Sequence, residues 1–455
     1  MTLPSFGGRQ SIARNTLLNF GGLSFPLLVG VAVMPIITRN LGATRFGLLG
    51  LTLALLEYSG LFDLGLGRAT TKHVAERLAT GDSEVSHLVV GSVVSQAAFG
   101  VLGGILFALA APFLAHNVFV IPASMQAEAV SVFRILGALI PATLLLVSLR
   151  GVLEAAHRFD LSNAIRVPSS LVSFLIPAIA SSHGYALPVI VGALFVSRIV
   201  FCTMMIFAVQ RAIPSMRWRL PDDWSMLRPL LAFGGWMSVS NVVSPLLIYL
   251  DRFMLGAFVG LSAVGYYTAP FDGVIRMLIV PGSLVNALFP SISGMQAMGD
   301  RVGLKRIFSK AVRNMSLILA APALVLMLFG PTLLHFWLGE TFAQQGGLAV
   351  RILALGVFLN SLSHVPSSFI VALGRPDINA KFHAAELVMH VPLAWWLITM
   401  YGVPGAAAAW TIRVAIDATL LFLAAGRLLD SSVWHLLSPA SAISARAQLP
   451  THADT

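Results

Sequence analysis

The chain has 455 residues, of which 57% are hydrophobic and 11% are charged, and its 29 lysines and arginines outnumber 19 acidic residues. So large an apolar share excludes a set of ordinary soluble domains and indicates an integral membrane protein. The single cysteine, Cys202, excludes both an internal disulfide and a cysteine-based zinc site.

Apolar runs long enough to cross a bilayer dominate the sequence. About 20 mostly apolar residues cross roughly 30 Å of hydrocarbon, so the sequence predicts an all-α, polytopic membrane protein with about 12 transmembrane helices. The first run is too long for the core of a removable signal peptide, and we expect it to be retained. In chain order the runs are Leu17 to Thr38, Phe46 to Phe62, Leu88 to Leu114, Ala127 to Leu149, Leu161 to Ser182, Ala186 to Val209, Leu230 to Leu250, Val264 to Phe289, Met315 to Leu334, Leu348 to Leu373, Ala380 to Met400 and Val403 to Ala425.

Basic residues gather in alternate loops between these runs. Lys and Arg resist transfer across the membrane, so loops rich in them are expected in the cytoplasm. With a cytoplasmic N-terminus most basic residues fall on that side, and only Arg39, Arg45 and Arg252 fall in outer loops. The pattern predicts that both termini are cytoplasmic, and it explains the basic charge by topology rather than by nucleic-acid binding.

Short strings recur at an offset of about 217 residues. Arg134-Ile135-Leu136 recurs as Arg351-Ile352-Leu353, and Arg158-Phe159-Asp160 recurs as Arg375-Pro376-Asp377. This repetition predicts two parallel six-helix lobes around a central cavity. The predicted division is an N-terminal lobe over residues 1–209, a cytoplasmic linker over 210–228, a C-terminal lobe over 229–426 and a cytoplasmic tail over 427–455.

Several arginines fall inside the predicted spans, where a charge normally faces water, a partner or the headgroups. Arg198, Arg276 and Arg413 lie near the middle of their runs, whereas Arg134 and Arg351 lie nearer the outer ends. A guanidinium stays charged and binds phosphate through paired donors. A cavity lined by these five arginines therefore suits an anionic, phosphate-bearing ligand.

Structural roles are open for four of the five arginines. Asp272 with Arg276, and Arg413 with Asp417, have the i,i+4 spacing of an ion pair within one helix. Arg134 and Arg351 could extend to the outer membrane surface.

Arg198 differs, because no acid lies within four positions of it. We expect it to contact another helix or a ligand. Glu57 and Glu386 also lie inside runs, and each could carry a coupling proton or neutralise an arginine.

Patterns typical of catalysis are missing from the sequence. The histidines form no His-Glu-x-x-His pattern and no glycine loop with a phosphate-binding lysine occurs, so no metal and no cofactor is expected. The outer loops are short and contain almost no acids for glycosyl-transfer chemistry. Transport by alternating closure of two lobes is favoured over an enzyme.

Five strings carry a resemblance to a known family. They are Asn19-Phe20-Gly21, RNLGATRFG from Arg39 to Gly47, DLGLG from Asp63 to Gly67, WLG from Trp337 to Gly339 and ALGRPD from Ala372 to Asp377. In this order they resemble the Wzx-type O-antigen and exopolysaccharide flippases, whose superfamily also contains multidrug antiporters and lipid II flippases. We interpret DLGLG as a helix end whose glycines allow a tight turn.

The resemblance implies a V-shaped, two-lobe carrier in the bacterial inner membrane. Its substrate would be an undecaprenyl-pyrophosphate-linked oligosaccharide for lipopolysaccharide or exopolysaccharide synthesis, and its partners would be polysaccharide polymerase and export machinery. Lipid II flippases carry an arginine in the first helix, whereas the run Leu17 to Thr38 has none. This difference argues against a lipid II flippase. The alternatives are a multidrug antiporter and a membrane-embedded polysaccharide polymerase or ligase.

Overall fold

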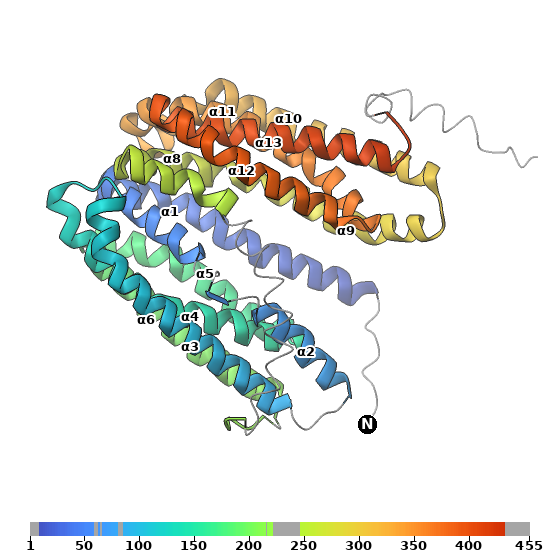
Figure 1. Cartoon of the computed structure of the whole chain (residues 1–455), viewed down its shortest axis with the longest axis horizontal. Coiled ribbons are helices and arrows are strands. Elements are labelled where there is room, and N and C mark those ends of the chain that lie inside the picture. The colour runs from blue at the N-terminus through green and yellow to red at the C-terminus, as the bar shows by residue number, and fades with distance from the viewer. Residues whose placement is uncertain are drawn as a thin grey trace, which may run out of the picture. The chain divides into compact units, whose positions relative to one another are not determined.

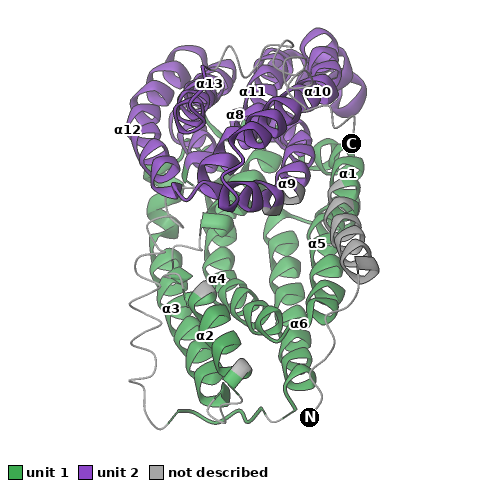
Figure 2. Cartoon of the chain, turned by 90° about the vertical axis from the view of Figure 1, so that its right-hand side faces the viewer, with its two compact units in different colours: residues 1–246, 260–262 green, residues 247–259, 263–455 purple. Residues whose placement is uncertain are grey.

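The computed structural model describes residues 9–58, 62–63, 66–80, 85–214, 216–221 and 246–432 (Figure 1). Within these ranges the side chains of residues 9–24, 27, 68, 79, 286, 287 and 290 are not described. The chain divides into two compact units, residues 1–246 with 260–262 and residues 247–259 with 263–455 (Figure 2). The predicted run Leu230 to Leu250 and the second part of the predicted linker 210–228 lie largely outside the described residues.

The first unit is built from helices α1 (Arg9–Tyr58), α2 (Leu66–Thr80), α3 (Val85–Phe113), α4 (Gln126–Ala155), α5 (Phe159–Ser182) and α6 (Leu187–Ala212). Helix α1 contains the first predicted run and the second as far as Tyr58, joined across a kink at Gly42. Gly42 has φ +70°, a left-handed conformation that side chains with a Cβ rarely adopt. This explains the glycine of the RNLG string.

The second unit contains a helical segment over residues 246–258, followed by α8 (Leu261–Val274), a 3₁₀ turn η5 (Ile275–Leu278) and α9 (Ile279–Ala297). Helices α10 (Arg301–Leu338), α11 (Glu340–Ala372), α12 (Pro376–Tyr401) and α13 (Val403–Leu428) complete it. The described residues contain no strand, and eight helical segments in them are long and apolar enough to cross a membrane. The prediction of an all-α, polytopic membrane protein is confirmed.

The runs that correspond to α3, α5, α6, α12 and α13 match these helices to within a few residues, whereas α10 begins 14 residues before its run, and α2 was missed. Helix α2 carries too many polar residues to be found as an apolar run, and it begins within the DLGLG string. There the Gly67 N–H donates to Asp63 Oδ1 at 3.0 Å. The string therefore marks the start of a helix, where a carboxylate accepts from a free N–H, rather than a helix end shaped by glycines.

The repeated Arg-x-Asp strings adopt the same local structure. Arg158 precedes α5 and donates through Nε and Nη2 to the carboxylate of Asp160, at 3.0 and 2.9 Å. Arg375 precedes α12 and holds Asp377 in the same way, at 2.9 and 3.2 Å, which lowers the pKa of Asp377 to about 2. Helices α3 and α10, α5 and α12, and α6 and α13 start 216 or 217 residues apart.

Close helix contacts and one apolar cluster hold each unit together. Gly104 on α3 faces Gly137 on α4 so closely that a Cβ on Gly104 would lie 2.3 Å from the Gly137 carbonyl oxygen. Small residues allow such close backbone approach in membrane helices. In the second unit, Phe308 packs edge-to-face on Phe369 at 5.0 Å within a buried cluster from α9, α10, α11 and α13.

The start of α10 holds the end of α13. Arg301 Nη1 donates to the Leu428 carbonyl at 2.8 Å, and Lys305 Nζ donates to the Asp430 carbonyl at 2.9 Å. The last carbonyls of a helix have no partner within the helix and carry partial negative charge. Two cations from a neighbouring helix therefore satisfy and stabilise this terminus.

Candidate functional site

In the first unit, Arg198 on α6 is half-buried against apolar side chains. It borders a cavity of about 30 Å³ whose lining includes Leu56, Leu136, Ser173 and Leu194. Such a volume holds about one water molecule and no larger ligand. No carboxylate of the described residues lies within 4 Å of its guanidinium, and the nearest acidic influence is Glu57, which is exposed at the end of α1.

Position 202, one helical turn after Arg198, carries the only cysteine. Cys202 is buried, and its Sγ donates to the Ala142 carbonyl of α4 at 3.1 Å. Burial raises the cost of forming a thiolate, so this cysteine acts as a small apolar side chain that fixes α6 to α4. It provides no charge for Arg198.

Arg134 and Arg351 are both exposed, on α4 and α11 respectively. Arg351 Nη2 reaches the Leu328 carbonyl of α10 at 3.4 Å, a long hydrogen bond. Neither arginine has an ion pair with a carboxylate among the described residues. Both groups are therefore accessible from outside their own unit.

In the second unit, Arg413 on α13 is only 8% exposed. Its Nη1 donates to Glu386 Oε2 on α12 at 3.1 Å. The i,i+4 spacing had indicated Asp417 as the partner, but the ion pair within 4 Å joins two different helices. Asp417 lies close to Glu386 instead, with the ligand oxygens of the two carboxyl groups within 4.8 Å of one another.

Asp272 also pairs with a residue other than the one its spacing indicates. Its carboxylate binds Arg252, whereas Arg276 Nε donates to the backbone carbonyl of Asp272 at 3.0 Å. Arg252 was expected in an outer loop, but it lies in the helical segment 246–258 and is 5% exposed. The helix extends past the end of the apolar run at Leu250, so Arg252 is a helix residue and not a loop residue; its position on the outer side of the membrane stays a prediction.

A third buried acid in this unit, besides Glu386 and Asp417, was missed in the sequence. Asp251 is fully buried and accepts from Tyr267 Oη at 3.1 Å, while His390 Nε2 lies 3.2 Å from its other oxygen. Burial of an ionised group is costly without partners, and the hydroxyl and the imidazole provide them. The available signal was His390, one of the few polar residues in the middle of the run Ala380 to Met400.

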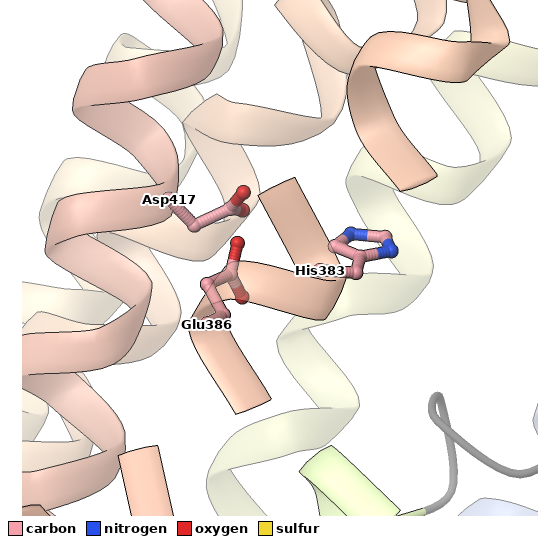
Figure 3. Close-up of side chains that lie close together, drawn as sticks. All are labelled: His383, Glu386 and Asp417. Carbon is pink, nitrogen blue, oxygen red and sulfur yellow. The ribbon is translucent and has the colours of Figure 1, made fainter. Parts of the chain in front are cut away.

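Three potential ligand groups meet beside Arg413. The nearest ligand atoms of His383, Glu386 and Asp417 all lie within 4.8 Å of one another (Figure 3). Calcium takes six to eight ligands, and zinc would need a water beside these three donors; the Arg413 guanidinium next to them also repels a cation. The same groups are well suited to hold or release a proton.

The structure thus divides the predicted arginines into two groups. Arg413 belongs to a buried network of the second unit, together with Glu386 and Asp417, and Arg276 lies beside Asp272 in the same unit. Arg134, Arg351 and Arg198 have no carboxylate within 4 Å among the described residues. Whether these arginines line one shared cavity stays a prediction, because the two units are described separately.

Comparisons with known proteins identify the family of this chain. Residues 12–296 match the family described as "Polysaccharide biosynthesis protein". A putative O-antigen transporter of Shigella flexneri is 29% identical over 419 residues, which cover 90% of this chain and 97% of that protein. A probable flippase of Haloferax volcanii, AglR, is 23% identical, with 95% of this chain and 86% of that protein covered.

Two solved structures share the fold. A multidrug resistance MATE family transporter of the MOP superfamily, in an inward-facing conformation, gives a TM-score of 0.75 at 18% identity and covers 91% of this chain and 98% of its own. The lipid II flippase MurJ, in an inward closed conformation, gives a TM-score of 0.72 at 12% identity, with 96% and 94% covered. At these identities the likeness establishes the fold alone.

Proposed function

The chain belongs to the polysaccharide biosynthesis protein family, and from this membership we propose that it is a flippase for a lipid-linked oligosaccharide. The proposed substrate is an undecaprenyl-pyrophosphate-linked repeat unit, which the protein would move from the cytoplasmic to the periplasmic leaflet of the bacterial inner membrane. The observation that carries the proposal is the match to a putative O-antigen transporter over nearly the full length of both chains.

The arginines support an anionic substrate. Arg198 is a half-buried guanidinium without a carboxylate within 4 Å among the described residues, a costly state inside a membrane unless water or an anionic ligand compensates it. A pyrophosphate offers the acceptors that a guanidinium binds in pairs. We assign Arg198 as the first phosphate contact, with the exposed Arg134 and Arg351 and the half-buried Arg276 as further contacts.

Arg413 takes a different part in this proposal. Because Glu386 holds its guanidinium and the side chain is buried, Arg413 is not free to bind a substrate in this state. It fixes α12 to α13, and it would reach a substrate only if Glu386 were neutralised. Transport rather than catalysis is proposed, and the relatives' names, transporter and flippase, agree with that choice.

The test compares Arg198→Ala with Arg211→Ala in a strain that lacks the chromosomal gene. Arg211 lies in the last turn of the same helix and is exposed, so it controls for loss of a positive charge from α6. At equal membrane abundance we expect Arg198→Ala to abolish polymer export and to leave lipid-linked single repeats on the cytoplasmic face. Arg211→Ala should export normally.

Other outcomes discriminate between the alternatives. Unchanged export by Arg198→Ala would remove this residue from the site. Repeats that accumulate on the periplasmic face in the deletion strain would indicate a polymerase or ligase. Drug sensitivity of that strain, with normal polymer, would indicate a multidrug antiporter.

A further inference from the structure

Two buried carboxyl groups face each other in the second unit. Glu386 on α12 is 2% exposed and Asp417 on α13 is 8% exposed. The ligand oxygens of the two carboxyl groups lie within 4.8 Å of one another, and Figure 3 shows the two groups pointing toward one another. Two acids buried this close together inside a membrane protein would repel each other if both were ionised.

Two buried carboxyl groups this close to each other can share one proton. Ionised carboxylates only accept hydrogen bonds, so two of them in contact have nothing to donate. Glu386 Oε1 and Asp417 Oδ1 have no N–H or O–H donor among the described residues. One proton placed on either group supplies the missing donor and removes the repulsion between two like charges.

The charge balance leads to the same number of protons. Arg413 donates to Glu386 Oε2 at 3.1 Å and is the cation in direct contact with the two acids. With Glu386 and Asp417 both ionised, this group of three side chains carries one net negative charge. With one shared proton it is neutral, the state that a buried site favours.

The surrounding charges do not alter this balance. Around the three side chains lie two further acids, two further arginines, two histidines and a tyrosine. The acids and arginines cancel when the histidines are neutral. These surrounding residues are Asp251 and Arg252 on the segment 246–258, Tyr267 and Asp272 on α8, Arg276 on η5, and His383 and His390 on α12.

A metal ion would fit the same place less well. Arg413 already occupies Glu386 Oε2, so Glu386 Oε1, Asp417 and His383 are the donors that remain. Three donors are fewer than calcium takes, and zinc would need a water as its fourth ligand. A divalent ion would also leave a net positive charge beside a buried guanidinium.

We propose that Glu386 and Asp417 form a proton-binding site that holds one shared proton in the state described here. The proton leaves from the carboxyl O–H to water past the half-buried His383, and both acids are then ionised beside Arg413. Resting on the proposed flippase function, this site supplies the ion whose movement drives the substrate. It places the driving ion in the second unit, apart from Arg198 in the first.

The proton can be observed directly by infrared spectroscopy. The full-length protein, purified and reconstituted in lipid, is measured between about pH 5 and about pH 9, a range in which exposed carboxyl groups are ionised over most of the interval. We expect a carbonyl band of a protonated carboxylic acid at neutral pH, lost in Glu386→Gln and lost in Asp417→Asn. Glu57→Gln, which removes an exposed acid of the first unit, should keep the band.

The amide variants preserve the shape of each side chain, and the wild-type spectrum decides the question even if a variant does not fold. A wild-type protein without the band overturns the proposal, as does a band that survives in both variants. A band removed by adding Na⁺, Mg²⁺ or Zn²⁺ at constant pH would show a metal site instead. The spectra need no substrate, so the proton site and the flippase function fail or stand separately: export tests the second and the band tests the first.

Discussion

Glu128 is a single carboxylate that stabilises the place where three helices meet. It lies in the first turn of α4, binds Arg45 Nε of α1 at 3.1 and 3.2 Å, and accepts from the Leu187 N–H at the start of α6 at 3.2 Å. The two contacts differ in kind. Arg45 is 48% exposed, so its ion pair is solvated, whereas the Leu187 N–H belongs to a helix N-terminus without a partner in its own helix.

We predict that Glu128→Ala costs more stability than Arg45→Ala. Loss of the Leu187 acceptor should cost about 1–3 kcal/mol, and loss of the exposed ion pair less than about 1 kcal/mol. Glu128→Gln keeps a carbonyl acceptor for Leu187 and should resemble Arg45→Ala. Thermal unfolding of the purified variants in one detergent measures the differences, and equal losses for Glu128→Ala and Arg45→Ala would contradict the argument.

Single-residue roles were the least predictable part of the molecule. Helical spacing correctly marks Arg413 and Asp272 as residues that need partners, but it compares only neighbours on one helix. The partners are Glu386, 27 positions away, and Arg252, 20 positions away, which are brought near by packing between helices. A sequence pattern carries no information about such contacts unless the packing is already known.

At the scale of helices, α3 and α4 are held by an approach of backbone to backbone. A Cβ on Gly137 would lie 2.6 Å from the Gly104 carbonyl oxygen, and a Cβ on Gly100 would lie 2.6 Å from Pro141 Cα. No side-chain movement can relieve such contacts, because the opposing atoms belong to the main chain. The helices themselves must separate when a side chain is added.

We therefore predict that Gly104→Ala lowers the unfolding temperature, with a loss of about 1–3 kcal/mol from overpacking. Gly192→Ala on α6 is the matched control, because no atom lies within 4 Å of its added Cβ and alanine favours a helix. The control should unfold at the wild-type temperature or above it. A Gly104→Ala protein as stable as the control would show that α3 and α4 separate at no cost.

Helices were more predictable than residues because apolar length alone identifies them. The runs matching α3, α4, α5, α6, α11 and α13 need no knowledge of packing. Two features escaped this criterion. Gly42 joins two runs into α1 without a loop, and α2 is too polar to count as a run although Asp63 fixes its start.

For the whole molecule, orientation in the membrane is the prediction with the widest consequences. The distribution of Lys and Arg places the C-terminal tail in the cytoplasm and the end of α5 outside. Every proposed substrate contact depends on this assignment, because it decides from which side Arg134 and Arg351 are reached. The buried Cys202 makes the protein convenient for testing it.

In a Cys202→Ser background, we predict that Ser182→Cys reacts with a membrane-impermeant maleimide in intact spheroplasts. Ser182 ends α5 and is exposed. Ser432→Cys, which is exposed in the described part of the tail, should react only after the membrane is permeabilised. The reverse pattern of labelling would show that the protein has the opposite orientation in the membrane.

The repeat relates Cys202 to Asp417, since Arg198 and Cys202 are four residues apart as are Arg413 and Asp417, at a common offset of 215 residues. One half of the chain keeps a carboxylate at this position, and the other has a thiol committed to the Ala142 carbonyl. If both proposals hold, this one difference in side chain separates the two roles: the first half has Arg198 without a carboxylate partner for the substrate, and the second half has the proton-binding site. An acid placed at position 202 would make the two halves of the chain alike at this position. It would neutralise Arg198 and so abolish the proposed substrate binding by the first half.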